Sequence, residues 1–240
     1  MAVVDWEKTG NIAIVKMVNN ENRQNLVFAN DLNKAIDEVL DDSDINAMLL
    51  SSASPKHWSL GVDVEWLMTQ FNDKNFDAIK QFMYRMNDVF KKLLTLPIPA
   101  IAAINGHAFG NGAILSCACD FRFMRQDRGY FCFPEVDLGI PFLPGMVEMV
   151  KKAVPAYKLN ELKLTGKRAG AAELEEAHVI EKACPDIDAL AEETMAFAGL
   201  FTKKRGIFSE HKKRMYRHII EAMDKRDPEY IESLALFIQE

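Results

Sequence analysis

The sequence has little of what membrane, metal-binding or disulfide-linked proteins need. No apolar run approaches the roughly 20 residues that cross a bilayer, and no basic segment followed by an apolar one opens the chain. The four cysteines form no CxxC pair, and the five histidines form no HxxxH pair. A net charge of -6 argues against a general nucleic-acid binder. We therefore expect a cytoplasmic protein with reduced core thiols, no bound metal, and no membrane or nucleic-acid partner.

Two common catalytic motifs are absent as well. The chain contains neither the GxSxG turn of serine hydrolases nor the GxxxxGK loop that cradles nucleotide phosphates, which disfavours a serine triad of that type and nucleotide hydrolysis. Apolar residues, in contrast, are plentiful: 49% of the 240 residues are hydrophobic and 27% are charged. That composition is sufficient for one large core.

Strand and helix patterns alternate in the first part of the chain, and helical patterns fill the rest from Gly145 onward. The expected segments are a hairpin over residues 3–6 and 12–16, a helix over 28–40 capped near Asn30 or Asp31, strands over 47–51, 100–105, 121–125 and 130–133, and helices over 113–119 and 210–223. Such alternation is typical of an α/β protein with an irregular sheet, followed by a C-terminal helical region.

The most informative stretch is residues 104–119, where an apolar strand runs through a glycine turn into an apolar helix. Gly110 and Gly112 flank Asn111, so the main chain can approach a ligand closely. The N–H of Asn111 would lie at the positive end of the following helix, which suits a developing negative charge. Alone, such a turn more often serves only close packing.

A basic run lies near the C-terminus of an otherwise acidic chain. It comprises Lys203, Lys204, Arg205, Lys212, Lys213, Arg214 and Arg217. A solvated helix face is one interpretation, and a contact with a phosphate-bearing ligand or another subunit is the other. His178 lies where a helix should end, and we interpret it as a helix-capping or core-edge residue.

Several separate segments together resemble the crotonase superfamily, also called the enoyl-CoA hydratase/isomerase family. The segments are residues 56–63 (KHWSLGVD), 97–112 (PIPAIAAINGHAFGNG), 133–140 (FPEVDLGI) and 164–168 (LTGKR), in the order and spacing of that family. Residues 123–129 and the tryptophan-containing segment 58–66 are most similar to its Δ3,Δ2-enoyl-CoA isomerase branch. The resemblance spans about residues 3 to 200.

This resemblance implies a crotonase-like ββα spiral core over residues 1–195 and a C-terminal helical region over residues 196–240. It also implies an acyl-CoA thioester as substrate, so that coenzyme A enters with the substrate and no separate cofactor is needed. The thioester carbonyl would be held by the backbone N–H groups of Val62 and Asn111. Two such donors can stabilise an enolate oxygen by several kcal/mol. Subunits of this family usually assemble as homotrimers or homohexamers.

The main departure from the family pattern is Ile114, where hydratases of the family carry one of two glutamates that activate water. Only the second, Glu135, is present here. A single carboxylate is sufficient to take a proton from C2 of a 3-enoyl thioester and return it at C4. The apolar neighbours of Glu135 should raise its pKa and make it a better base. The sequence therefore predicts an isomerase with Glu135 as proton shuttle.

Other substrate contacts follow from the resemblance. The backbone around Leu60 would meet adenine, with Lys56 and Arg23 near the phosphates and Gly61, Gly110 and Ile114 beside the thioester. Candidates for the acyl pocket are Trp66, Leu67, Phe71, Phe82, Met83, Met86 and Phe142.

Two alternatives stay open. One is hydration or another crotonase-type reaction, such as thioester hydrolysis or carbon–carbon cleavage, which would need a further polar group near Ile114, such as His107 or Asp137. The other is a non-catalytic CoA-binding subunit, because the first glutamate is missing.

Overall fold

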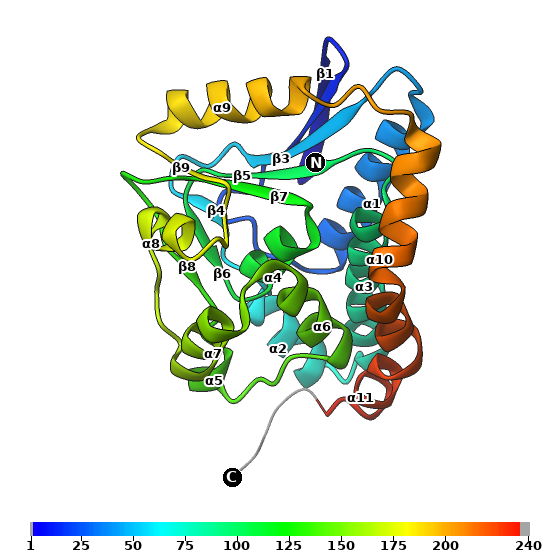
Figure 1. Ribbon diagram of the computed structural model, residues 1–240. Coiled ribbons are helices and arrows are strands. Elements are labelled where there is room, and N and C mark those ends of the chain that lie inside the picture. The colour runs from blue at the N-terminus through cyan, green and yellow to red at the C-terminus, as the bar shows by residue number, and fades with distance from the viewer. Residues whose placement is uncertain (1, 236–240) are drawn as a thin grey trace.

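A six-stranded sheet forms the centre of the computed structural model, which describes residues 2–235 (Figure 1). Its first two strands form an antiparallel hairpin, in which Thr9 pairs with Ile12, and every later strand pairs in parallel with its neighbour. The order across the sheet is β1 (Val4–Thr9), β2 (Ile12–Met17), β3 (Ala47–Ser52), β5 (Ala100–Ile104), β7 (Phe121–Arg125) and β9 (Lys182–Cys184). The predicted α/β class is thus confirmed.

Both faces of this sheet are covered, which explains why its central strands read as continuous apolar runs. In β3, Met48 and Leu50 point to the larger core, whereas Ala47 and Leu49 point to a smaller core on the opposite face. Helix α9 (Ile187–Gly199) covers the smaller core, as Figure 1 shows. On the other face, α1 (Leu26–Asp41) packs against β1 and β2, α3 (Phe76–Thr95) packs against α1, and α10 (Arg205–Lys225) packs against α3.

Helix α1 begins earlier than the sequence predicted. Asn25 is its N-cap, and the Asn25 side-chain oxygen accepts hydrogen bonds from the N–H groups of Val27 (3.1 Å) and Phe28 (3.2 Å). The prediction of a cap at Asn30 or Asp31 was therefore wrong. All three are suitable capping residues, and the choice among them depends on where the apolar face of the helix meets the sheet.

A second, smaller sheet lies next to the first and was only partly predicted. It consists of β4 (His57–Ser59), β6 (His107–Phe109) and β8 (Phe131–Cys132), all parallel. The expected strand over residues 130–133 contains β8. The other two strands have only three residues each, which is too few for an alternating pattern to be recognised.

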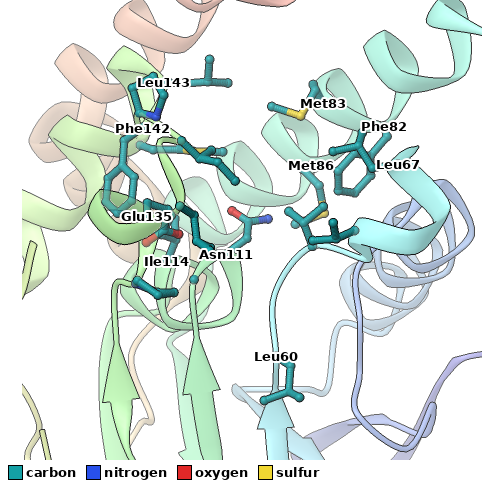
Figure 2. Close-up of a pocket in the computed structure, with 18 of the residues that line it drawn as sticks. Leu60, Leu67, Phe82, Met83, Met86, Asn111, Ile114, Glu135, Phe142 and Leu143 are labelled. Carbon is teal, nitrogen blue, oxygen red and sulfur yellow. The ribbon is translucent and has the colours of Figure 1, made fainter. Parts of the chain in front are cut away.

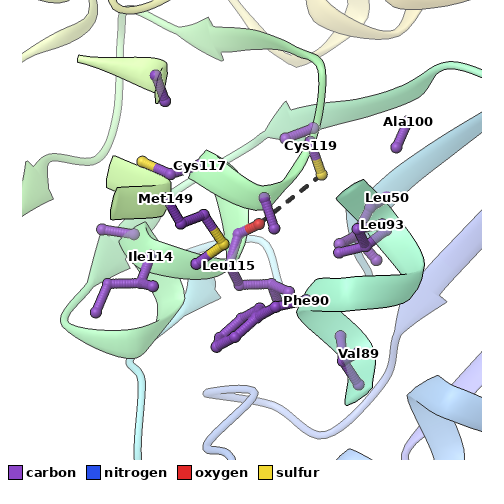
Figure 3. Packing of buried hydrophobic residues seen from close by; sticks show 14 of the residues in the cluster. Leu50, Val89, Phe90, Leu93, Ala100, Ile114, Leu115, Cys117, Cys119 and Met149 are labelled. Carbon is purple, nitrogen blue, oxygen red and sulfur yellow. Dashed lines mark hydrogen bonds between the residues drawn. The ribbon is translucent and has the colours of Figure 1, made fainter. Parts of the chain in front are cut away.

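Helix α4 (Asn111–Ala118) is buried along its whole length between the sheets and the surrounding helices. Figure 3 shows its apolar side chains against Phe90 of α3 and Met149 of α6 (Pro144–Ala153). All four cysteines are free and buried, as expected for core thiols. Burial raises the pKa of the Cys119 thiol to about 12, which keeps it protonated and unreactive.

The basic run near the C-terminus has two separate roles. Arg205, at the start of α10, donates hydrogen bonds to the carbonyls of Leu40, Asp42 and Ile45. Lys212 is buried and forms an ion pair with Asp120 at 2.6 Å. The remaining basic side chains of the run are exposed. Two of the seven cations therefore anchor α10 to the core, which the prediction of a solvated face did not anticipate.

The remaining helices complete the C-terminal part of the chain. They are α7 (Ala156–Thr165), α8 (Ala171–Glu176) and α11 (Asp227–Ser233). His178 follows the end of α8 with φ of 55°, which agrees with its predicted place at a helix end. The predicted division into residues 1–195 and 196–240 stays a prediction, and its outermost residues, 1 and 236–240, lie outside the described part. No described helix is both long and apolar enough to cross a membrane.

Candidate active site

A cavity of about 260 Å³ opens between the N-terminus of α4 and the helices α2 (Val64–Asn72) and α3. Figure 2 shows Glu135 and Phe142 on one wall, Phe82 and Met86 on the other, and Asn111 between them. The lining residues are Arg23, Leu60, Val62, Val64, Leu67, Phe82, Met83, Met86, Gly110, Asn111, Ile114, Pro134, Glu135, Leu138, Ile140, Pro141, Phe142, Leu143 and Met146. Most of these side chains are apolar, so the cavity suits an acyl chain.

Glu135 is the carboxylate of this cavity. It is the first residue of the short helix α5 (Glu135–Leu138), and its Oε2 atom is buried without a hydrogen-bond partner among the described residues. Burial raises the pKa of Glu135 to about 7, against the opposing effects of a backbone hydrogen bond and the Lys163 charge. A carboxylate with this pKa can both take and return a proton near neutral pH.

Gly110 brings the carboxylate next to the turn that precedes α4. Its φ is 53°, and a Cβ atom placed on Gly110 would lie 3.1 Å from Oε1 of Glu135. Gly110 is thus the residue of the turn with positive φ, whereas Asn111 already belongs to the helix. Asparagine at position 111 therefore needs no left-handed backbone.

The N–H of Val62 is directed away from Gln24, the residue that pairs with it in an isolated bridge. Val62 forms a parallel bridge with Gln24, in which Gln24 N–H donates to the Gly61 carbonyl (2.8 Å) and Asp63 N–H donates to the Gln24 carbonyl (2.9 Å). In this pattern both polar backbone groups of Val62 point to the other side. Among the described residues, the Val62 N–H has no acceptor, and Val62 lines the cavity.

The N–H of Asn111 is the second available donor. Asn111 is the first residue of α4, and the N–H groups of the first helical turn have no acceptor within the helix. The two donor segments are in direct contact, because a Cβ atom on Gly61 would lie 2.9 Å from the Asn111 nitrogen. Gly61 also has φ of 79°, so this position requires glycine for two reasons. Two amides without an acceptor among the described residues therefore belong to residues that line one cavity beside a carboxylate.

Several predicted contacts line the cavity, and others lie elsewhere. Leu60, Gly110, Ile114 and Phe142 line it, with Arg23 and four of the acyl-pocket candidates: Leu67, Phe82, Met83 and Met86. Lys56 is exposed at the surface, and Gly61 lies behind the lining. Trp66 packs edge-on against Phe82 at 5.5 Å and thus supports the wall without lining it. Phe71 is exposed and packs against Phe76.

The two polar side chains proposed to assist Ile114 also lie outside the lining. The His107 ring packs against His57 at 5.8 Å and Phe109 at 5.0 Å, on the small sheet. Asp137 is exposed on α5. Ile114 itself is 2% exposed. The sequence analysis assigned a role to the Asn111 backbone but none to its side chain. The buried Oδ1 atom of that side chain has no partner among the described residues.

Other residues of the site were not anticipated from the sequence. Leu143, just before α6, lies across the cavity from Met83 of α3 (Figure 2), and Met146 of α6 also lines the cavity. The apolar residues at the start of α6 did not indicate in the sequence which side of the helix would face a ligand. Lys163, on α7, lies with its ammonium 4.4 Å from the centre of the Phe142 ring and lowers the pKa of Glu135. No group of three or more potential metal-binding side chains occurs within residues 2–235.

Comparison with known proteins agrees with this geometry. A family model described as "Enoyl-CoA hydratase/isomerase" matches residues 7–233. Enoyl-CoA delta isomerase 3 of Arabidopsis thaliana is 28% identical over 200 residues, which cover 79% of this chain and 81% of the relative. The peroxisomal enoyl-CoA delta isomerase 2 of the same plant is 30% identical over 153 residues, which cover 63% of this chain and 64% of the relative.

A solved structure with the same fold is that of an enoyl-CoA hydratase from Bacillus halodurans. It superposes with a TM-score of 0.88 over 99% of this chain and 96% of the hydratase, at 21% sequence identity. This likeness confirms the predicted crotonase-like fold with its C-terminal helical region.

Proposed function

Because the chain belongs to the enoyl-CoA hydratase/isomerase family, we propose that it is an acyl-CoA isomerase that moves a double bond from position 3 to position 2 of the acyl group. The isomerase names of its relatives support this choice of reaction. The observation that carries it is the buried Oε2 atom of Glu135, which has no hydrogen-bond partner among the described residues. It lies in an apolar cavity where Ile114 stands in the place of the other glutamate of the hydratases. One base and no second acid suit proton transfer better than water addition.

The reaction requires one proton to move twice. The Glu135 carboxylate takes a proton from C2 of the 3-enoyl thioester, and the C–H electrons delocalise to form a dienolate with its charge on the thioester oxygen. The N–H groups of Val62 and Asn111 donate hydrogen bonds to that oxygen. Glu135 then returns the proton at C4, leaving a double bond between C2 and C3. A pKa of about 7 lets the same group act as base and acid.

The lining also supports a proposal for how the substrate lies. Arg23 and Leu60 both line the cavity, and we place the coenzyme A portion beside these two residues. The exposed Lys56 would be a second contact for its phosphates. The acyl chain would extend between Phe82, Met86 and Phe142. The substrate brings coenzyme A itself, so no separate cofactor takes part. Assembly as a homotrimer or homohexamer stays a prediction, as does a cytoplasmic location.

The proposal is tested by assaying 3-enoyl, 2-enoyl and 3-hydroxyacyl thioesters side by side with the wild-type protein and the Glu135→Gln variant. We expect the wild type to convert the 3-enoyl to the 2-enoyl thioester. Glu135→Gln should lower kcat about 100- to 10,000-fold, the usual contribution of a general base. The affinity for a saturated acyl-CoA should remain within about threefold, because both backbone donors stay in place.

The control is Glu192→Gln, at an exposed position on α9, which should leave kcat unchanged. Wild-type kcat in Glu135→Gln would show that Glu135 is not the base. A protein that binds acyl-CoA but converts none of the thioesters would instead be a non-catalytic CoA-binding subunit.

One observation favours hydration as a second candidate. The buried Oδ1 atom of Asn111 has no partner within residues 2–235 and could accept a hydrogen bond from a water molecule at the site. Glu135 would then take a proton from that water as it adds to C3 of a 2-enoyl thioester, and would return this proton at C2 of the resulting enolate. The same assay distinguishes the reactions, because a hydratase forms the 3-hydroxyacyl product and an isomerase does not. Loss of this product in an Asn111→Gly variant that still isomerises the 3-enoyl thioester would identify the Asn111 side chain as the group that orients water.

A further inference from the structure

Gln24 connects the two segments that carry the proposed oxyanion donors. It is fully buried, with 0% of its surface exposed, between the loop that contains Val62 and the turn that contains Asn111. Its main chain is bonded to the first segment on both sides of Val62, through Gly61 and Asp63. These two bonds fix the direction in which the Val62 N–H points.

The side chain of Gln24 is bonded to the second segment. Its Oε1 atom accepts a hydrogen bond of 2.6 Å from Asn111 Nδ2, and its Nε2 atom lies 3.5 Å from the Asn111 carbonyl oxygen. Nε2 also donates to Ser59 Oγ at 3.1 Å, and that hydroxyl oxygen accepts from the Gly61 N–H at 3.2 Å. Gln24 is therefore bonded to both donor segments at once. In the second segment, the bond is made by the Asn111 side chain.

We propose that Gln24 is a positioning residue that sets the orientation of the Val62 and Asn111 amides relative to each other, with Asn111 Nδ2 as its partner. The inference rests on the proposed function, because the two amides matter only if they hold a developing oxyanion. Donors must be in place before the charge forms, and misplacement by about 1 Å can lower a rate about 100-fold. A side-chain amide pair in a buried site is a rigid means of fixing that separation.

The asparagine at position 111 thus has a second role besides its backbone N–H. The sequence resemblance assigns this position only the role of its backbone N–H. Here the side chain points back toward Gln24 and ties the start of α4 to the segment before α1. Gln24 and Asn111 are both buried, so their polar atoms have few alternative partners if one of them is removed.

The test compares Gln24→Met with the wild type. Methionine keeps most of the volume and both main-chain bonds of position 24 but removes the bonds to Asn111 and Ser59. With a 3-enoyl-CoA such as 3-hexenoyl-CoA, we expect kcat to fall about 10- to 100-fold. The dissociation constant for hexanoyl-CoA should change by less than about threefold, because a saturated thioester develops no oxyanion.

A second variant approaches the same bond from the other side. Asn111→Gly removes Nδ2 and keeps the amide, and it should lower kcat by a similar factor. The double variant should be no slower than the slower single variant, because both changes break one shared bond. Asn33→Ala is the matched control: Asn33 is buried and bonded to the Arg85 carbonyl, away from the cavity. It should lower thermal stability while kcat of the folded protein stays at the wild-type value.

Amide hydrogen exchange separates this inference from the proposed function. The Val62 and Asn111 amides should exchange faster in Gln24→Met and Asn111→Gly than in the wild type, with or without turnover. If the wild type isomerises 3-hexenoyl-CoA but Gln24→Met keeps wild-type kcat and exchange, the positioning role is overturned and the isomerase proposal stands. If the wild type converts no 3-enoyl thioester, the proposed function fails, and unchanged exchange would reject the Gln24 contact as well. Additive losses in the double variant would also overturn it.

Discussion

Asp120 and Glu135 are two of the largely buried carboxylates of this protein, and they differ in their partners. Oδ2 of Asp120 accepts hydrogen bonds from the Ala100 N–H (2.8 Å) and from Lys212 (2.6 Å). Oε2 of Glu135 has no partner among the described residues. Asp120 joins β5, the end of α4 and α10, whereas Glu135 faces a cavity. The comparison indicates that a paired buried charge holds elements together, while an unpaired one retains the capacity to react.

The pairing of Asp120 can be broken from the side of α10. Lys212→Met should lower the free energy of unfolding by about 3 to 5 kcal/mol, because Asp120 would then be a buried charge without a counter-ion. Urea unfolding measures this change. Lys213→Met is the control on the same helix: Lys213 is exposed, and its loss should change stability by less than about 0.5 kcal/mol.

The isomerase activity of folded Lys212→Met should remain near the wild-type value, because Lys212 and Asp120 do not line the cavity. Unchanged stability in Lys212→Met would mean that the ion pair does not anchor α10. Addition of Asp120→Asn should recover part of the lost stability, since the unpaired charge is removed with it.

The unpaired state of Glu135 should itself lower stability. Its pKa is about 7 in the folded protein against a usual value of 4.5, so the folded state binds more protons between these values. The free energy of unfolding therefore falls as pH rises from 4.5 to 7 and stays reduced above it. Glu135→Gln removes this effect and should stabilise the protein at pH 8 by about 1 to 2 kcal/mol, allowing for partial solvation.

Urea unfolding at pH 8 and pH 4.5 measures this difference for Glu135→Gln and for the exposed control Glu192→Gln. The gain of Glu135→Gln over the wild type should be larger at pH 8, and the control should show no such dependence. An equal effect at both pH values would mean that burial does not raise the pKa of Glu135. Loss of activity together with increased stability is the combination expected of a functional site.

The sequence was sufficient for the parts of this structure that depend on local pattern or on the family motifs. The α/β class follows from alternating strand and helix patterns, and the meeting of Gly110, Asn111 and Glu135 at one cavity follows from motif spacing. Short strands were not predictable, because β4 and β6 each have three residues and exist through pairing between distant segments. The N-cap of α1 was missed because several asparagines and aspartates near its start can cap a helix equally well.

The cavity walls show the same limit at the level of single residues. Trp66 and Leu67 are neighbours on α2, and both are apolar, but only Leu67 lines the cavity. Which of them faces inward depends on how α2 docks against α3, where Trp66 packs on Phe82. Gln24 was similarly hidden, because a glutamine before a helix has no sequence signal that distinguishes a buried contact from a solvated one. Such contacts are determined by tertiary packing.

The charge of Lys163 offers the smallest test of the comparison between the two carboxylates. Lys163 lowers the pKa of Glu135, so Lys163→Met should raise it further. Glu135 acts as a base only when ionised, and wild-type kcat/KM should therefore fall as pH drops below about 7. In Lys163→Met this decline should begin at higher pH, while kcat/KM well above the transition stays within about threefold. Lys151→Met, at a lysine exposed on α6, should leave the profile unchanged. A decline that moves to lower pH would mean that Lys163 does not act on Glu135 through its charge.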